Sequence, residues 1–165
     1  MENKSSSKPL ESQYPSVDLA YEFVKPSYDW MLNRIEAMNS KIQGLLTLAT
    51  AVTAAMPILI KAMFDNVDFQ SVWFIIAIAT YFLLVIIGIY GLRMGGVKLV
   101  NPKKLYERRL SESIWEFKKN TVYFSGQDFE QNKRTIDVKH HLRDIMNVLL
   151  LAELIVVVVW IVTTG

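Results

Sequence analysis

Three long apolar blocks separate the charged segments of this chain and limit what it can fold into. The first uncharged block is 42–60, "IQGLLTLATAVTAAMPILI", which lies between Lys41 and Lys61. A helix over these residues is about 28 Å long, close to the ~30 Å hydrocarbon core of a bilayer. The second block, 71–92, ends at Arg93 and is also long enough to cross a membrane.

The third block, 148–165, is uncharged except for Glu153. Its "IVVVV" run would suit a β-strand, but a lone strand with open edges is not viable in lipid, so a third helix is predicted. The sequence therefore predicts an all-α integral membrane protein with transmembrane helices at about 42–63, 71–92 and 146–165. Because the linker between the first two helices is short, we expect them to form an antiparallel hairpin.

The residues before the first block predict a leader and an amphipathic helix. Residues 1–16 are polar and contain two prolines, which is typical of a disordered leader. Residues 17–41 predict an amphipathic cytoplasmic helix. Its apolar side chains recur at three- and four-residue steps: Tyr28, Met31, Leu32, Ile35, Met38 and Ile42. Pro26 predicts an interruption of this helix, with Ser27 capping a new helix start.

The long charged segment 93–145 predicts a cytoplasmic helical hairpin. Asn101 followed by Pro102 is typical of a helix start. Gly126, within "YFSGQD", predicts the turn between the two arms. The second arm leads into the third span, and its expected apolar stripe is Val138, Leu142, Ile145 and Leu149.

The distribution of basic residues predicts the orientation. Of the 18 Lys and Arg residues, 12 fall in 93–147, whereas the linker 61–70 carries only Lys61. The positive-inside rule then places the long segment and the N-terminus in the cytoplasm and the C-terminus outside. The predicted location is a plasma (inner) membrane, crossed several times.

Glu153 is the one charged residue inside the three apolar blocks. It lies about five residues into the third block, ~8 Å along a helix from the cytoplasmic end. Lys41 and Arg93 end the other two spans on the same side and are its predicted partners, with Gln43 and Thr47 as hydrogen-bonding alternatives. We favour a structural pair. A pore-lining or proton-sensitive group in an oligomer is the other interpretation, since ionisable residues inside membranes are often functional.

Small residues recur at helical spacing along the first span. They are Gly44, Thr47, Ala51 and Ala55. Such residues let two helices approach closely in a membrane. Packing within one protomer is the preferred interpretation, and self-association is the second.

The chain carries no motif of an enzyme or a cofactor site. It has no cysteine and no nucleotide-binding, hydrolase or zinc-protease pattern, so no catalytic residue, cofactor or metal is predicted. His140 and His141 point about 100° apart on a helix and do not suit one metal ion.

A basic patch precedes and enters the predicted hairpin. Its members are Lys98, Lys103, Lys104, Arg108 and Arg109. A solvated helix face is the default interpretation, attraction to anionic headgroups is the second, and binding of a nucleotide-like anion is the third. Nucleic acid is not a predicted partner.

The layout resembles small bacterial membrane effectors of nucleotide-signalling antiphage systems, such as SLATT-type and Pycsar-type transmembrane effectors. The features that carry the resemblance are the lead-in "YDWMLNRIEAMNSKIQGLL", the two-helix hairpin 42–92 and the helix after "NPKKL". The resemblance covers about residues 20–120. It implies pore formation or membrane disruption once a partner or a nucleotide signal activates the protein. The third span departs from a two-span plan.

The function expected from these features is that of a non-enzymatic effector that oligomerises in the lipid bilayer and perturbs it. Three spans cannot enclose an aqueous pore alone, so this interpretation requires a homo-oligomer. The alternative is a membrane adaptor whose cytoplasmic helices bind a protein partner. An intramembrane enzyme or transporter comes third, because the chain is small and Glu153 is the only acidic or basic residue within the three apolar blocks.

Overall fold

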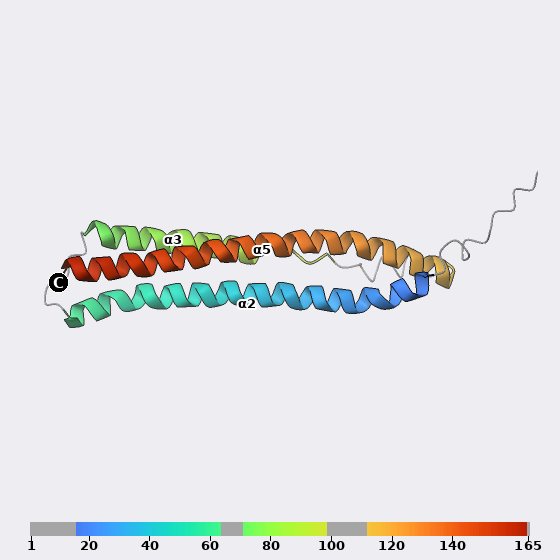
Figure 1. Cartoon of the computed structure of the whole chain (residues 1–165), viewed down its shortest axis with the longest axis horizontal. Helices are drawn as coiled ribbons and strands as arrows, with labels where there is room; N and C mark the ends of the chain where they lie inside the picture. Colours follow the sequence, from blue (N-terminus) through green and yellow to red (C-terminus); the bar gives the residue numbers. More distant parts are fainter. Residues whose placement is uncertain (1–15, 64–70, 99–111, 165) are drawn as a thin grey trace, which may run out of the picture. The chain divides into compact units, whose positions relative to one another are not determined.

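The computed structural model describes residues 16–63, 71–98 and 112–164, and most of these residues lie in long helices. The helices are α2 (Val17–Met63), α3 (Val72–Arg93) and α5 (Ile114–Thr164) (Figure 1). Within the described ranges there is no strand, and three helices are long and apolar enough to cross a membrane. The all-α prediction and the three apolar helices are thereby confirmed.

The predicted amphipathic helix and the first span are one continuous helix, α2. Pro26 lies inside it and does not interrupt it. The ring removes one backbone donor. Next to it, the Ser27 hydroxyl donates a 2.7 Å hydrogen bond to the Phe23 carbonyl within the helix instead of capping a new one. The predicted apolar stripe is correct at Met31, Ile35 and Met38, which are all buried.

The predicted cytoplasmic hairpin is absent from the described residues, because α5 runs without a break through 123–128. Gly126 is an exposed helical residue there. The helix begins instead at a capping box. The Glu116 backbone N–H donates to the Ser113 hydroxyl over 3.2 Å, and the Glu116 carboxylate accepts from the Ser113 backbone N–H over 3.4 Å. Most of the predicted first arm lies outside the described residues.

The chain divides into two compact units. The first comprises Met1–Asn33 and Val97–Arg134, and the second comprises Arg34–Gly96 and Thr135–Gly165. Both α2 and α5 contribute residues to each unit. The apolar helix α3 belongs to the second unit.

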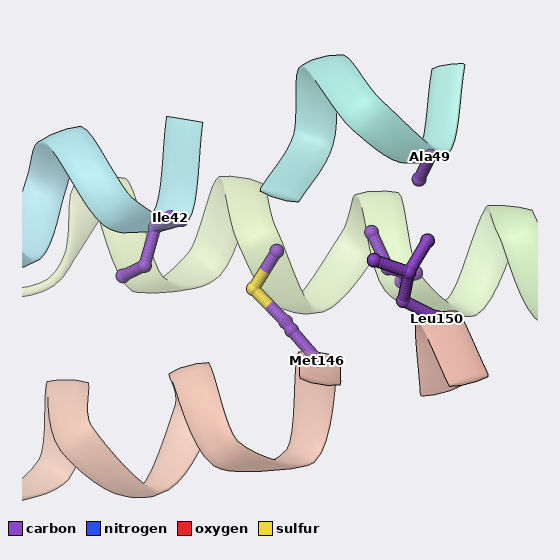
Figure 2. Close-up of a cluster of buried hydrophobic side chains, with 5 residues drawn as sticks. Ile42, Ala49, Met146 and Leu150 are labelled. Carbon is purple, nitrogen blue, oxygen red and sulfur yellow. The ribbon is translucent and has the colours of Figure 1, made fainter. Parts of the chain in front are cut away.

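The second unit is a bundle of three helices, in which α3 runs antiparallel to α2 and α5 (Figure 1). Its first core cluster is Ile42, Ala49, Leu84, Met146 and Leu150. Figure 2 shows Met146 and Leu150 of α5 directed toward the helix that carries Ile42 and Ala49. A second cluster, nearer the ends of α2 and α5, is Met56, Ala77, Val157 and Trp160. The Phe74 and Trp160 rings pack there with centroids 4.9 Å apart.

Buried positions along α2 and α5 recur at steps of three, four or seven residues. On α5 they are Ile136, Lys139, Met146, Leu150, Glu153, Val157 and Trp160. Such a repeat is typical of coiled-coil-like packing, and these buried positions form the seam between the helices. Of the predicted α5 stripe, Leu142 and Leu149 are half-buried, and Leu149 packs against the first core cluster. Val138 and Ile145 are exposed. The true seam therefore includes a lysine and a glutamate.

Glycines let α3 approach its neighbours closely. A Cβ at Gly88 would lie 2.6 Å from Leu46 Cδ2 and 2.8 Å from Leu46 Cγ, so Leu46 would have to move. At Gly91 a Cβ would lie 3.2 Å from Ile42 Cδ1. After α3 ends, Gly95 adopts a φ of 80°, which glycine tolerates best, against the side chain of Thr135.

We expect Gly88→Ala to destabilise the bundle by about 1–3 kcal/mol, because the added methyl overlaps Leu46 in a packed contact. Gly44→Ala is the matched control, since a Cβ at Gly44 meets nothing within 4 Å. Alanine there should stabilise the helix by up to ~1 kcal/mol. Chemical unfolding of the purified protein in detergent, followed by circular dichroism, measures both. Equal effects of the two substitutions would contradict this packing.

Candidate functional site

The candidate site is built around Glu153, which is fully buried in the seam between α2 and α5. Its Oε1 lies 2.6 Å from the Thr53 hydroxyl oxygen. The Thr53 hydroxyl also lies 3.0 Å from the Ala49 carbonyl oxygen, one turn earlier on α2. Glu153 Oε2 is buried and has no hydrogen-bond partner among the described residues. The site is thus a carboxyl group that meets one hydroxyl in apolar surroundings.

Glu153 lies deeper among the apolar residues than the sequence suggested. Its partner Thr53 is near the middle of the uncharged block 42–60. The last charged residue before Glu153 on α5 is Asp144, so the uncharged run begins at residue 145 rather than at 148. Counted from there, Glu153 also falls near the middle of its run. The predicted shallow position came from starting the count at Val148.

The predicted partners of Glu153 lie elsewhere. Lys41 and Arg93 are both exposed, and no ion pair joins either one to Glu153 in the part of the chain that the structure describes. The Thr47 hydroxyl donates to the Gln43 carbonyl over 3.0 Å, within its own helix. The structure instead places the Thr53 hydroxyl within hydrogen-bonding distance of Glu153, and Thr53 was not among the predicted partners.

A buried lysine forms a second polar contact in the same unit. Lys139 is 1% exposed, and its Nζ donates to Asn39 Oδ1 over 2.8 Å and to the Gly91 carbonyl over 2.6 Å. Gly91 belongs to the last turn of α3, where carbonyl groups lack partners within the helix. The ammonium group therefore caps the negative end of α3. Lys139 was not among the predicted site residues, because a lysine in a charged segment, between Asp137 and Arg143, is expected to be exposed.

The same sequence separation relates α2 to α5 in both polar contacts. Asn39 to Lys139 and Thr53 to Glu153 each span 100 residues. A constant separation means that the two helices run parallel and in uniform register through the second unit. Within the first unit, Asp18 pairs with Lys118 at 2.9 Å and Tyr28 donates to Asp128 at 3.1 Å, with the same separation of 100.

The predicted small-residue stripe faces outward. Gly44, Thr47 and Ala51 are exposed, and Ala55 is half-buried. The buried residue of this region is Ala49, on the opposite side of α2. Gly44, Thr47 and Ala51 therefore do not pack within the protomer, contrary to the preferred interpretation of the stripe. Ala51 and Ala55 instead line an apolar groove of about 400 Å³, whose other wall includes Leu154 of α5.

The remaining predicted residues do not form a site in the described ranges. Lys98 of the basic patch has an exposed side chain, while Lys103, Lys104, Arg108 and Arg109 lie outside the described residues. The backbone of Lys98 is held by Asn132, which donates to its carbonyl and accepts from its N–H, both over 3.0 Å. Among described residues no group of His, Asp and Glu could hold a metal ion.

Comparisons with known proteins identify no relative. No protein-family model matches the sequence, no curated protein matches it, and no solved structure matches the fold.

Lys139 should make the free energy of unfolding depend on pH, and comparison with Lys139→Met isolates its contribution. Burial lowers the pKa of Lys139, which lies outside the uncharged run of α5. In the window between that lowered pKa and the ordinary value of about 10.4, the unfolded chain binds a proton that the native state lacks. The free energy of unfolding of the wild type should therefore rise with pH in this window, relative to Lys139→Met.

Lys118→Met is the matched control, with the opposite sign. The hydrogen bond to Asp18 raises the pKa of Lys118, so its stabilisation is present at neutral pH and declines as the pH rises through that raised pKa. Unfolding curves in detergent from pH 7 upward measure both differences. A Lys139→Met protein whose stability stays parallel to that of the wild type would show that the buried ammonium is not desolvated.

Proposed function

We propose that this protein is a non-enzymatic membrane effector that self-associates in a bilayer and perturbs it. Its N-terminus and residues 93–145 would face the cytoplasm and its C-terminus the outside, as the distribution of basic residues favours. Three helices long and apolar enough to cross a membrane support an integral membrane location. Large apolar side chains exposed on the second unit, such as Ile58, Phe82 and Ile86, suit contact with lipid.

The observation that carries self-association is the outward stripe of small residues on α2. Lipid chains fill any surface, so an exposed small residue gives no advantage toward lipid alone. Toward another helix it allows close backbone contact and van der Waals packing, which drive helix association in membranes. The exposed residues Gly44, Thr47 and Ala51 continue into the groove beside Leu154. We infer that a helix of a second copy packs along this stripe.

The proposal requires several copies, because the core of the second unit is filled by side chains. Ile42, Leu84 and Met146 are all fully buried between its three helices. A water-filled path would therefore form between protomers and not within one. Defence against phage, with a protein or nucleotide signal as the trigger, is the biological setting that the resemblance to antiphage effectors suggests.

An adaptor remains the second candidate because the first unit exposes aromatic side chains. Phe23 is 65% exposed and Tyr123 is 62% exposed, and Trp30 and Phe124 are exposed as well. Phe23 also lines a groove of about 260 Å³ together with Tyr28 and Phe129. In a unit outside the apolar blocks, such side chains suit a protein partner.

The double substitution Gly44→Leu/Ala51→Leu should weaken self-association without unfolding the protomer. Both positions are exposed, and the larger side chains hold a neighbouring helix away. The chain has no cysteine, so amine-reactive crosslinking in native membranes and detergent-resistant oligomers on gels provide the measurement. Ile86→Leu, at an exposed position on α3, is the matched control and should crosslink as the wild type does.

Controlled expression with a membrane-potential dye separates the two functions. The effector proposal expects depolarisation by the wild type in its native host, supplied with its signal, and less depolarisation by the double variant. Crosslinked oligomers that persist in the double variant would reject the small-residue interface. An unchanged membrane potential, together with loss of a captured partner when Phe23→Ser and Tyr123→Ser are introduced, would favour the adaptor.

A further inference from the structure

We propose that Glu153 and Thr53 form a proton-binding site, in which the carboxyl group is protonated at neutral pH and donates its hydrogen to the Thr53 hydroxyl. This inference concerns one protomer and holds whether or not copies associate. Glu153 is 0% exposed, and the ligand of the site is a single proton.

The count of hydrogens at Thr53 supports the proposal. The Thr53 oxygen is within hydrogen-bonding distance of two oxygens, 3.0 Å from Ala49 O and 2.6 Å from Glu153 Oε1. A threonine hydroxyl has one hydrogen to donate, and an ionised carboxylate has none. With Glu153 ionised, one of the two contacts would join two acceptor oxygens without a hydrogen. With Glu153 protonated, Thr53 donates to Ala49 and accepts from Glu153, so both contacts are hydrogen bonds.

Among the described residues, the charges around the site give no counter-ion for a carboxylate. On α2, Lys41 and Lys61 bound an uncharged run that contains Thr53. On α3 the ionisable residues before Arg93 are Tyr81 and Tyr90, and the Tyr81 hydroxyl lies 3.2 Å from the Thr50 hydroxyl. On α5 the nearest charged residues are Asp144 and Arg143, which pair with each other about 14–15 Å from Glu153 along the helix. The buried Lys139 lies 14 positions and about 21 Å away.

The second carboxyl oxygen of Glu153, Oε2, also favours the protonated form of the side chain. Oε2 of Glu153 has no hydrogen-bond partner among the described residues. An ionised carboxylate needs several donors when it leaves water, and without them burial is strongly unfavourable. A neutral acid needs only an acceptor for its hydrogen, which Thr53 provides. Release of the proton to bulk water would leave a bare carboxylate in the seam and weaken the contact between α2 and α5.

Infrared spectroscopy of the full chain in phosphatidylcholine vesicles tests the site directly. At pH 7 exposed carboxyl groups are ionised, because their pKa is about 4. The wild type should nevertheless show the carbonyl stretch of a protonated carboxylic acid. Glu153→Gln should lose this band. Glu36→Gln, which alters an exposed acid on α2, is the matched control and should retain it.

A second variant keeps the test decisive if Glu153→Gln fails to fold. Thr53→Val removes the hydroxyl acceptor but keeps the side-chain shape, so the acid band should remain and shift to higher frequency. The proposal would be overturned by a wild type without an acid band at pH 7. It would equally be overturned by a band that survives Glu153→Gln, or by one that Thr53→Val leaves unshifted.

Discussion

Two buried polar groups in an otherwise apolar seam impose the strictest constraint on this bundle. Glu153 and Lys139 cannot reach water, so each needs a partner on a neighbouring helix. Thr53 and Asn39 supply those partners from α2, and Gly91 supplies a carbonyl from the end of α3. A shift of one residue in register would rotate these groups by about 100° and separate both pairs. Buried polar residues are known to fix register in coiled coils, and here they fix the parallel pairing of α2 and α5.

The apolar contacts alone would fix the register of the helices less strictly. In lipid, apolar side chains gain little by leaving the solvent, so packing between helices depends on shape and on polar contacts. Gly88 and Gly91 contribute shape by admitting Leu46 and Ile42 close to α3. The stripe that begins at Gly44 contributes nothing to the interior of the protomer, because it faces outward. Small residues thus occur both inside the bundle, where they admit neighbouring side chains, and on its outer surface, where they do not pack within the protomer.

The sequence predicted the parts of the fold that depend on length and hydropathy. The three apolar helices appear where uncharged runs of about twenty residues occur, and the buried face of α2 follows its apolar spacing at Met31, Ile35 and Met38. The predicted breaks were less reliable. Pro26 and Gly126 both lie inside continuous helices, since tertiary packing can outweigh local propensity over a single residue. The pattern "SIWE", a capping box at Ser113, was the local signal that marks where α5 begins.

The candidate site could be predicted only in part, because its partners depend on register. Glu153 is conspicuous in the sequence, but the side chain opposite it follows from how α2 and α5 align. Charge alone pointed to Lys41 and Arg93, which are exposed. Lys139 and Asn132 carry no sequence signal of burial, because lysine and asparagine are usually solvated. Thr53 resembles every other threonine of the first span until its neighbour on α5 is known.

The central claim is the parallel register of α2 and α5 in the membrane, and cysteine crosslinking tests it most directly. The chain has no native cysteine, so the pair Met56→Cys/Val157→Cys can be oxidised in native membranes without competition. After cleavage at a protease site inserted between residues 106 and 107, the two fragments should stay joined by a disulfide. The pair Met56→Cys/Leu150→Cys, shifted by two turns or about 10 Å, should not crosslink, since a disulfide needs Cα atoms within about 7 Å. Efficient crosslinking of the shifted pair, with none for Met56→Cys/Val157→Cys, would contradict this register.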